Sequence, residues 1–201
     1  MLASNAMEMT PPTEHIGEPV TPAMFREVFR RHPGGVIVIT AAGDEGPVAL
    51  TITSLISVSA EPPAVAFSLS SQSSSAAVFR KASHVVVHFI RNSDRALAER
   101  CAMKGADRFG PGVSWTTLPT GEPLFTGVST WFRACISQQV DVHGSTLVVA
   151  EPMEGRVLPE SRSGWSTEQP LVYVDRQWRV LGAALDKDQP GIPWSLYEPM
   201  F

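Results

Sequence analysis

Residues 46–63 read GPVALTITSLISVSAEPP, a stretch in which apolar and β-branched side chains are interleaved with threonine and serine. This composition favours extended backbone, so we expect strands at 48–51 and 55–59. The sequence Glu61-Pro62-Pro63 ends the second strand, because proline has no N–H group to contribute to a central ladder. The stretch therefore predicts a strand, a turn and a second strand, with hydroxyl groups along both.

The same alternation of short β-rich runs and turns continues on both sides of this stretch. A helix is expected after Thr21, a capping residue, with Pro22 in its first turn. Further strands are expected at 36–40, 64–70, 84–90, 128–142, 145–157, 171–174 and 177–182, and further helical segments at 73–82 and 94–104. Many strands with few helices predict an all-β fold with a few helices, built as an antiparallel barrel or sandwich rather than from βαβ units.

Length and composition limit the class of protein. The chain has 201 residues, of which 43% are hydrophobic, and a net charge of −4. We expect a flexible arm at 1–20, one domain at 21–183, and an apolar tail at 184–201 that packs on this domain or on a second subunit. Because the net charge is negative, we do not expect a nucleic acid partner. We also expect no membrane helix, because the apolar runs are shorter than the roughly 20 residues that such a helix needs. No secretory signal is visible, so two cysteines, Cys101 and Cys135, indicate a reduced, cytoplasmic setting.

The segment at 49–59 is the most informative for chemistry, since it offers hydroxyl and backbone N–H groups within an apolar strand pair. A flavin ring needs this mixture, because one end of the ring is apolar and the other carries donors and acceptors. From chemistry alone, an ordinary half-buried strand pair with water-facing hydroxyls is the better interpretation.

Common catalytic motifs are absent, and we expect no metal site: His84 and His88 lie on an expected strand, about 13 Å apart. Aromatic side chains, Phe25 and Phe29 among them, are expected in the core.

Five blocks, in this order, resemble the flavin reductase-like, FMN-binding split-barrel family. The blocks are Phe25-Arg26 with 33–40, the stretch 46–63, Asp107-Arg108-Phe109 with 113–115, 121–124, and 170–173 with 178–182. The resemblance implies an FMN-binding split β-barrel with antiparallel, Greek-key strands. It also implies an NAD(P)H:flavin oxidoreductase that supplies reduced flavin to the oxygenase of a two-component monooxygenase. FMN or FAD as the flavin, NADH or NADPH as the electron donor, and a homodimer are implied in the same way.

The resemblance also assigns candidate cofactor-binding residues. The strand after Gly46 is expected to line the flavin ring, the turn after it to contact the polar edge of the ring, and the end of the following strand to supply backbone contacts. Ser74, Ser75 and Arg100 are candidates for binding the flavin phosphate, because a guanidinium fits phosphate geometry. The alternative is that Arg100 is an ordinary solvated residue of the helix. The full set is Pro47, Val48, Ala49, Leu50, Thr51, Thr53, Ser54, Ser68, Leu69, Ser70, Ser74, Ser75 and Arg100.

One stretch departs from the pattern of this family. Where the family has Gly-Asp-His before a β-rich run, this chain has His143-Gly144-Ser145. Ser145 thus takes the place of the histidine that the family puts near the nicotinamide, and His143 lies two residues earlier. His143 and Ser145 are the candidate catalytic residues. Three outcomes are open for the role of the family's histidine: His143 performs it, Ser145 performs it, or it is lost in this chain. Two alternatives stay open: a flavoprotein that keeps its flavin and oxidises or monooxygenates an organic substrate, and a non-catalytic flavin binder.

Overall fold

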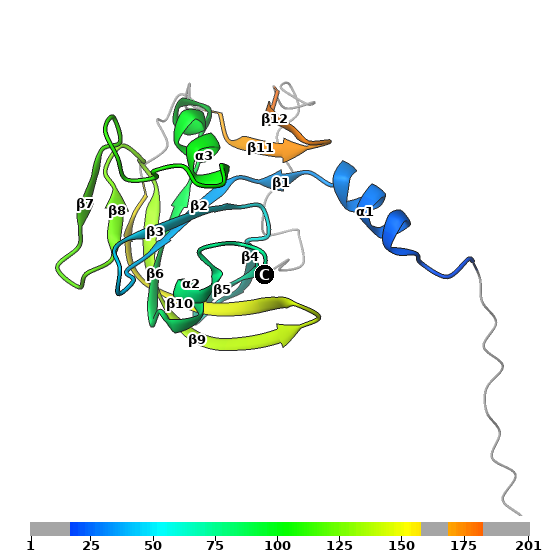
Figure 1. The fold of residues 1–201 in the computed structure, drawn as a ribbon, viewed down its shortest axis with the longest axis horizontal. Coiled ribbons are helices and arrows are strands. Elements are labelled where there is room, and N and C mark those ends of the chain that lie inside the picture. The colour runs from blue at the N-terminus through cyan, green and yellow to red at the C-terminus, as the bar shows by residue number, and fades with distance from the viewer. Residues whose placement is uncertain (1–16, 158–168, 183–201) are drawn as a thin grey trace, which may run out of the picture.

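The computed structural model describes residues 17–157 and 169–182, which form one large curved sheet, two small sheets and four helical segments (Figure 1). The helical segments are α1 (Pro22–Arg31), α2 (Ala76–Lys81), the 3-10 turn η1 (Asn92–Asp94) and α3 (Arg95–Ala102). The strands are β1 (Gly34–Gly35), β2 (Ile37–Ala41), β3 (Val48–Ile52), β4 (Ile56–Ala60), β5 (Pro63–Ser70), β6 (His84–Phe89), β7 (Trp115–Thr117), β8 (Pro123–Phe125), β9 (Trp131–Val142), β10 (Ser145–Arg156), β11 (Leu171–Val174) and β12 (Gln177–Val180). The expected all-β fold with a few helices is confirmed.

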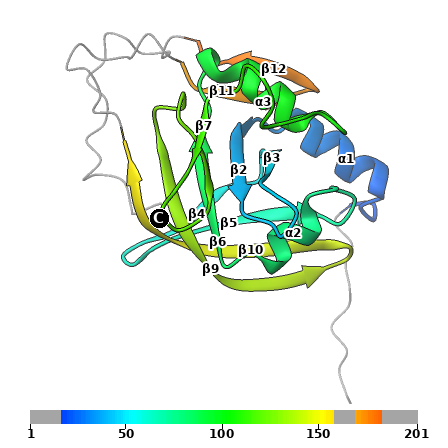
Figure 2. The same ribbon diagram turned by 60° about the vertical axis from the view of Figure 1, so that its left-hand side comes forward.

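Seven strands form the large sheet in the order β3-β2-β6-β9-β10-β5-β4, and all its neighbours are antiparallel. The connection from β3 to β4 crosses from one end of the sheet to the other. The sheet curves until the turn after β3 meets β5 (Figure 2): the Ser54 hydroxyl accepts a hydrogen bond from the Ser68 N–H at 3.1 Å and donates to the Ser68 carbonyl at 3.3 Å. Antiparallel pairing is therefore confirmed. Closure into a barrel stays a prediction, because the described ladders leave β3 and β4 at the two ends of the sheet.

The two faces of the curved sheet differ in their side chains. On β5, Val65, Phe67 and Leu69 are buried in the core inside the curve, whereas Ser68 and Ser70 point to the outer face and are exposed. A second core lies between β2, β3, α3 and β8. These two cores fix β3 and β5, the strands that carry most of the predicted site residues.

His88 joins β6 to its neighbours from inside the protein. It is completely buried, its Nδ1 lies 3.0 Å from the Val38 carbonyl oxygen, and its Nε2 accepts a hydrogen bond from the Phe125 N–H at 3.1 Å. The imidazole is therefore neutral, with its proton on Nδ1. Desolvation by burial lowers the pKa of His88 from 6.5 to about 4, although its backbone hydrogen bonds oppose the shift.

We expect acid to destabilise the protein through His88. A lowered pKa in the folded state means that the unfolded chain binds the proton first, so stability is intact above pH 6.5 and falls as the pH drops toward 4. Between pH 7 and pH 5 the free energy of unfolding should fall by about 2 kcal/mol, measured by denaturant titration. In the His88→Gln variant, whose amide does not titrate, this part of the pH dependence should disappear. An unchanged pH dependence in that variant would contradict the assignment.

Several sequence predictions need correction. Phe25 and Phe29 are 55% and 57% exposed, because neither core among the described residues includes α1, which is linked to the turn before β12 by the ion pair of Arg30 with Asp175 at 3.3 Å. The hairpin of β7 and β8 was not expected.

Thr21 caps α1 as expected, with its hydroxyl accepting a hydrogen bond from the Met24 N–H at 3.2 Å. The expected tail at 184–201 and most of the expected arm at 1–20 lie outside the described residues. Within the described ranges, no helix is long and apolar enough to span a membrane.

Candidate functional site

Several of the side chains predicted to line the flavin ring pack wholly or partly against the protein interior. Val48 and Leu50 pack on the core inside the curve, and Ala49 is fully buried in the second core. The Thr51 hydroxyl donates to the Ala98 carbonyl oxygen of α3 at 2.7 Å. Pro47 is exposed just before the strand. Because β3 is an end strand of the large sheet, what it offers to a ligand is the backbone of its free edge.

The turn after β3 is held in a defined position. Thr53 is exposed, and the backbone of Gly34 lies against it: a Cβ added to Gly34 would come within 2.8 Å of both the Thr53 Cβ and its carbonyl oxygen. Ser54 uses its hydroxyl to hold the turn against Ser68 of β5. The structure thus brings Thr53, Ser54 and Ser68 together, as the sequence predicted, but assigns the Ser54 hydroxyl to the protein itself.

The end of β5 leads into a serine-rich segment that ends at α2. Leu69 has a fully buried side chain, so it offers a ligand only its backbone, while Ser68 and Ser70 are exposed. Ser74 is exposed and Ser75 is buried. The predicted serines therefore follow one another along the chain from the outer face of β5 to the start of α2, and we call this stretch, residues 68–75, the serine edge.

Arg108 is the cation that the structure brings to this edge. Its Nη1 donates to the Ser75 hydroxyl at 2.7 Å, and its Nη2 donates to the Met103 carbonyl oxygen at 3.4 Å. Its Nε is buried and has no hydrogen-bond partner among the described residues. The Nε has no exposed surface for a ligand to meet. The charge of Arg108 beside the Ser75 hydroxyl is what would attract an anion.

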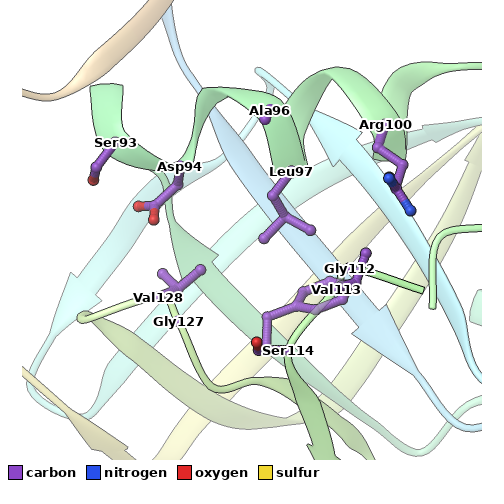
Figure 3. A pocket seen from close by; sticks show the side chains of 11 residues that line it. Ser93, Asp94, Ala96, Leu97, Arg100, Gly112, Val113, Ser114, Gly127 and Val128 are labelled. Atoms are coloured by element: carbon purple, nitrogen blue, oxygen red, sulfur yellow. The ribbon is translucent and has the colours of Figure 1, made fainter. Parts of the chain in front are cut away.

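Arg100 lies near Arg108, since both charges act on Cys101, but it makes different contacts. It lines a pocket of about 230 Å³ between α3 and the loops at 112–114 and 127–128 (Figure 3). Among the described residues, its Nη1 makes two long hydrogen bonds, to the carbonyl oxygens of Asp107 at 3.5 Å and Pro111 at 3.4 Å. The described contacts thus bring Arg108, and not Arg100, to the predicted serines.

The thiol of Cys101 is buried beside these two arginines. Burial raises the pKa of Cys101 to about 12, and the charges of Arg108 and Arg100 oppose this shift only in part. Cys101 is therefore a protonated core side chain at neutral pH, as expected from the sequence. Among the described residues, no group of three metal-binding side chains is found.

The turn between β9 and β10 carries both candidate catalytic residues. His143 and Gly144 have φ angles of 44° and 82°, so they form a two-residue turn with left-handed backbone at both positions. Ser145 begins β10, opposite Val142 on β9 and Ser70 on β5. His143 therefore belongs to the turn and does not share the alternation of the strand with Ser145, although it lies only two residues earlier.

The chemistry of this edge fits a ligand with a phosphate at one end and a planar polar group at the other. Arg108 and Ser75 offer a cation and a hydroxyl to an anion. The free edge of β3, Thr53 and the serines of β5 offer donors and acceptors to a ring edge. The donor set therefore suits a flavin mononucleotide, and no metal is needed for it.

Comparison with known proteins identifies the family. The sequence profile of the flavin reductase-like domain matches residues 29–182. An NADH:FMN oxidoreductase of Rhodococcus erythropolis is 36% identical over 154 residues, which are 77% of this chain and 79% of that protein. The chain belongs to the flavin reductase-like domain family.

Two further members of the flavin reductase-like family support the match. The reductase subunit HsaB of a flavin-dependent monooxygenase from Rhodococcus jostii is 30% identical over 177 residues, which are 88% of this chain and 85% of that protein. The crystal structure of a flavin reductase domain protein from Arthrobacter covers 81% of this chain and 96% of its own chain, at 30% identity and a TM-score of 0.72. The resemblance stated from the sequence is thereby confirmed, together with the antiparallel β architecture.

Arg108 is the residue of this flavin reductase-like domain that sequence reasoning missed. The block Asp107-Arg108-Phe109 indicated the family, but no role was assigned to its arginine. A tight turn aims this side chain: the Asp107 carboxylate accepts a hydrogen bond from the Phe109 N–H at 3.1 Å, and a Cβ at Gly110 would lie 2.1 Å from that carboxylate. The arginine inside this short turn was the feature of the sequence that could have indicated a site residue.

Proposed function

We propose that this protein is an NAD(P)H-dependent flavin reductase that supplies reduced FMN or FAD to a partner flavin-dependent monooxygenase. The family match over residues 29–182 carries this proposal, because it spans both described cores and the whole serine edge. Relatives that match most of this chain are named as an NADH:FMN oxidoreductase and as the reductase subunit of a monooxygenase. The same function was expected from the sequence.

Different residues of the chain would bind the flavin phosphate, bind the flavin ring and orient the nicotinamide. A bound flavin supplies the ring that accepts the hydride. Arg108 and Ser75 would hold the phosphate, and the β3 edge with Thr53 would hold the polar edge of the ring. Ser145, next to Ser70 on the outer face, would orient the nicotinamide. The residues of the chain would thus bind both ligands and orient them for hydride transfer.

The direct test is a kinetic one. Purified protein should oxidise NADH or NADPH only when FMN, FAD or riboflavin is added, and the reduced flavin should leave and support a separate oxygenase. Ser145, in the place of the family's histidine, is the observation that favours the alternative of a non-catalytic flavin binder. Tight flavin binding with no NAD(P)H oxidation above the uncatalysed rate would decide for that alternative.

We also propose a homodimer in a reduced, cytoplasmic setting. Exposed apolar side chains gather on the outer face of the large sheet, where Val140 lies opposite Leu147, which in turn lies opposite Ser68. Val140 and Val142 are 48% exposed and Ile56 is 59% exposed. A second copy would bury this face, beside Ser68, and the apolar side of α1 offers it further surface. Both cysteines are unpaired, which agrees with the reduced setting.

The protein should run as a dimer of twice 21.7 kDa in light scattering at micromolar concentration. Charging the outer face with Val140→Lys and Leu147→Lys together should shift it to the monomer, because two lysine ammonium groups on each copy would be buried without partners. Flavin affinity should fall as well, since the serine edge lies beside this face. Val180→Lys, at a 39% exposed valine of β12, is the matched control and should stay dimeric. A monomeric parent protein would contradict the proposal.

A further inference from the structure

The hairpin of β9 and β10 is tied to α2 by a polar network on its core side. The Thr146 hydroxyl donates to the Asp141 carboxylate at 2.8 Å and accepts a hydrogen bond from the Arg80 Nε at 3.0 Å. Thr146 and Asp141 are direct cross-strand partners, one residue beyond the pair that closes the turn. The side chain of Thr146 is almost fully buried, so its hydroxyl has both of these bonds sheltered from water.

Two more hydrogen bonds join the same parts of the chain. The Gln139 side-chain amide donates to the Arg80 carbonyl oxygen at 3.1 Å. The Gly144 carbonyl oxygen, in the turn itself, accepts a hydrogen bond from the Ser71 N–H at 3.0 Å. The turn is therefore held from the core side through Arg80 and from the serine-rich segment through Ser71.

These ties connect the two ends of the candidate site. The segment that holds the turn runs from Ser71 to α2, and it includes Ser75, which pairs with Arg108. On the other side, Thr146 is the residue directly after Ser145. A shift of the hairpin relative to α2 would therefore change the distance between the phosphate anchor and the position of Ser145.

We propose that Arg80, Thr146 and Asp141 are positioning residues for hydride transfer: they fix the β9–β10 turn, and with it Ser145, relative to the Ser75–Arg108 pair. This proposal rests on the flavin reductase function proposed above. The hydroxyl suits the role because a single oxygen donates to the carboxylate and accepts from the guanidinium. The Thr146 hydroxyl thus lies between the guanidinium of Arg80 on α2 and the carboxylate of Asp141 on β9.

Thr146→Val tests the network with little change in volume. Loss of the hydroxyl removes both hydrogen bonds, while the charged groups of Arg80 and Asp141, on exposed residues, are free to take water instead. We expect kcat/KM for NADH to fall about 10-fold, because displacement of a reacting group by about 1 Å costs up to 10²-fold in rate. The primary kinetic isotope effect with 4-deuterated NADH should rise, since hydride transfer becomes slower. The Kd for FMN, measured by fluorescence titration, should stay within about 2-fold.

Two variants make the result specific to this hydroxyl. Thr146→Ser keeps it and should restore kcat/KM to near the parent value. Ser137→Ala removes a hydroxyl from the far part of the same hairpin, where it donates to the Val149 carbonyl oxygen at 3.4 Å, and should leave kcat/KM unchanged. The proposal is overturned if Thr146→Val keeps the kcat/KM of the parent, or if the serine variant is as impaired as the valine variant. A parent protein that oxidises no NAD(P)H overturns the reductase function as well, so the two failures are distinguishable.

Discussion

Arg108→Gln should weaken the binding of FMN about 100-fold. The guanidinium lies on the Ser75 hydroxyl, so a phosphate bound there would gain charge-assisted hydrogen bonds that the neutral amide of glutamine does not replace. Such bonds are worth about 1.5–3 kcal/mol each, and about 2.7 kcal/mol corresponds to 100-fold in Kd. Riboflavin has the same ring but no phosphate, so its Kd should change less than about 2-fold. Fluorescence titration of both flavins measures the two effects on the same preparation.

Arg100→Gln is the matched control for this substitution. Arg100 carries the same charge on α3, but it lies in the pocket of Figure 3, where its bonds to carbonyl oxygens are long. Its replacement should leave the affinities for FMN and riboflavin nearly unchanged. If Arg100→Gln weakened FMN binding and Arg108→Gln did not, the phosphate would belong to that pocket. Equal losses for FMN and riboflavin with Arg108→Gln would indicate a general disturbance of the serine segment.

The contrast between these two arginines shows where prediction from the sequence ends. Local patterns identified α3 and the loop after it, but they do not define the rotation of the helix about its axis. That rotation is set by Ala98 and Cys101, which pack into the second core, and it turns Arg100 toward the 112–114 loop. The position of Arg108 depends on a tight turn and on a contact with Ser75, 33 residues away in the sequence. Tertiary packing of this kind leaves no local pattern.

The strands show the same division. β2, β3 and β5 were predictable, because each is a short β-rich run bounded by glycine or proline. The three-residue strands β7 and β8 are too short to give a periodic signal, and long-range contacts hold them in place. His88 accepts a hydrogen bond from the Phe125 N–H, and Glu122, just before β8, forms a buried ion pair with Arg133 of β9 at 3.1 Å. The register between β5 and β10, which brings Ser70 to Ser145, is likewise a property of the assembled sheet.

That register leads to the second large effect, an increase in activity from Ser145→His. Ser145 is half-buried at the start of β10, directly opposite Ser70, so an imidazole there would lie on the outer face beside the serine edge. A serine side chain is shorter than the histidine that the resemblance implies at this place, so it would reach less far toward a bound nicotinamide. We expect kcat/KM for NADH to rise by up to about 10²-fold, the size of a typical orientation effect, with the Kd for FMN unchanged. Steady-state kinetics and flavin titration on the same preparation measure both.

His143→Asn is the control that decides between the two candidate residues. Asparagine tolerates the left-handed backbone at φ 44° and forms, with Gly144, the dipeptide most favoured in such a turn, so the hairpin should keep its geometry. An alanine there would add backbone strain to the loss of the imidazole and confuse the result. If Ser145 occupies the operative position, His143→Asn should leave kcat/KM for NADH within about 3-fold of the parent. A large fall in that variant, with no gain from Ser145→His, would instead assign the nicotinamide contact to His143, which the turn would then hold over the ring from outside the strand.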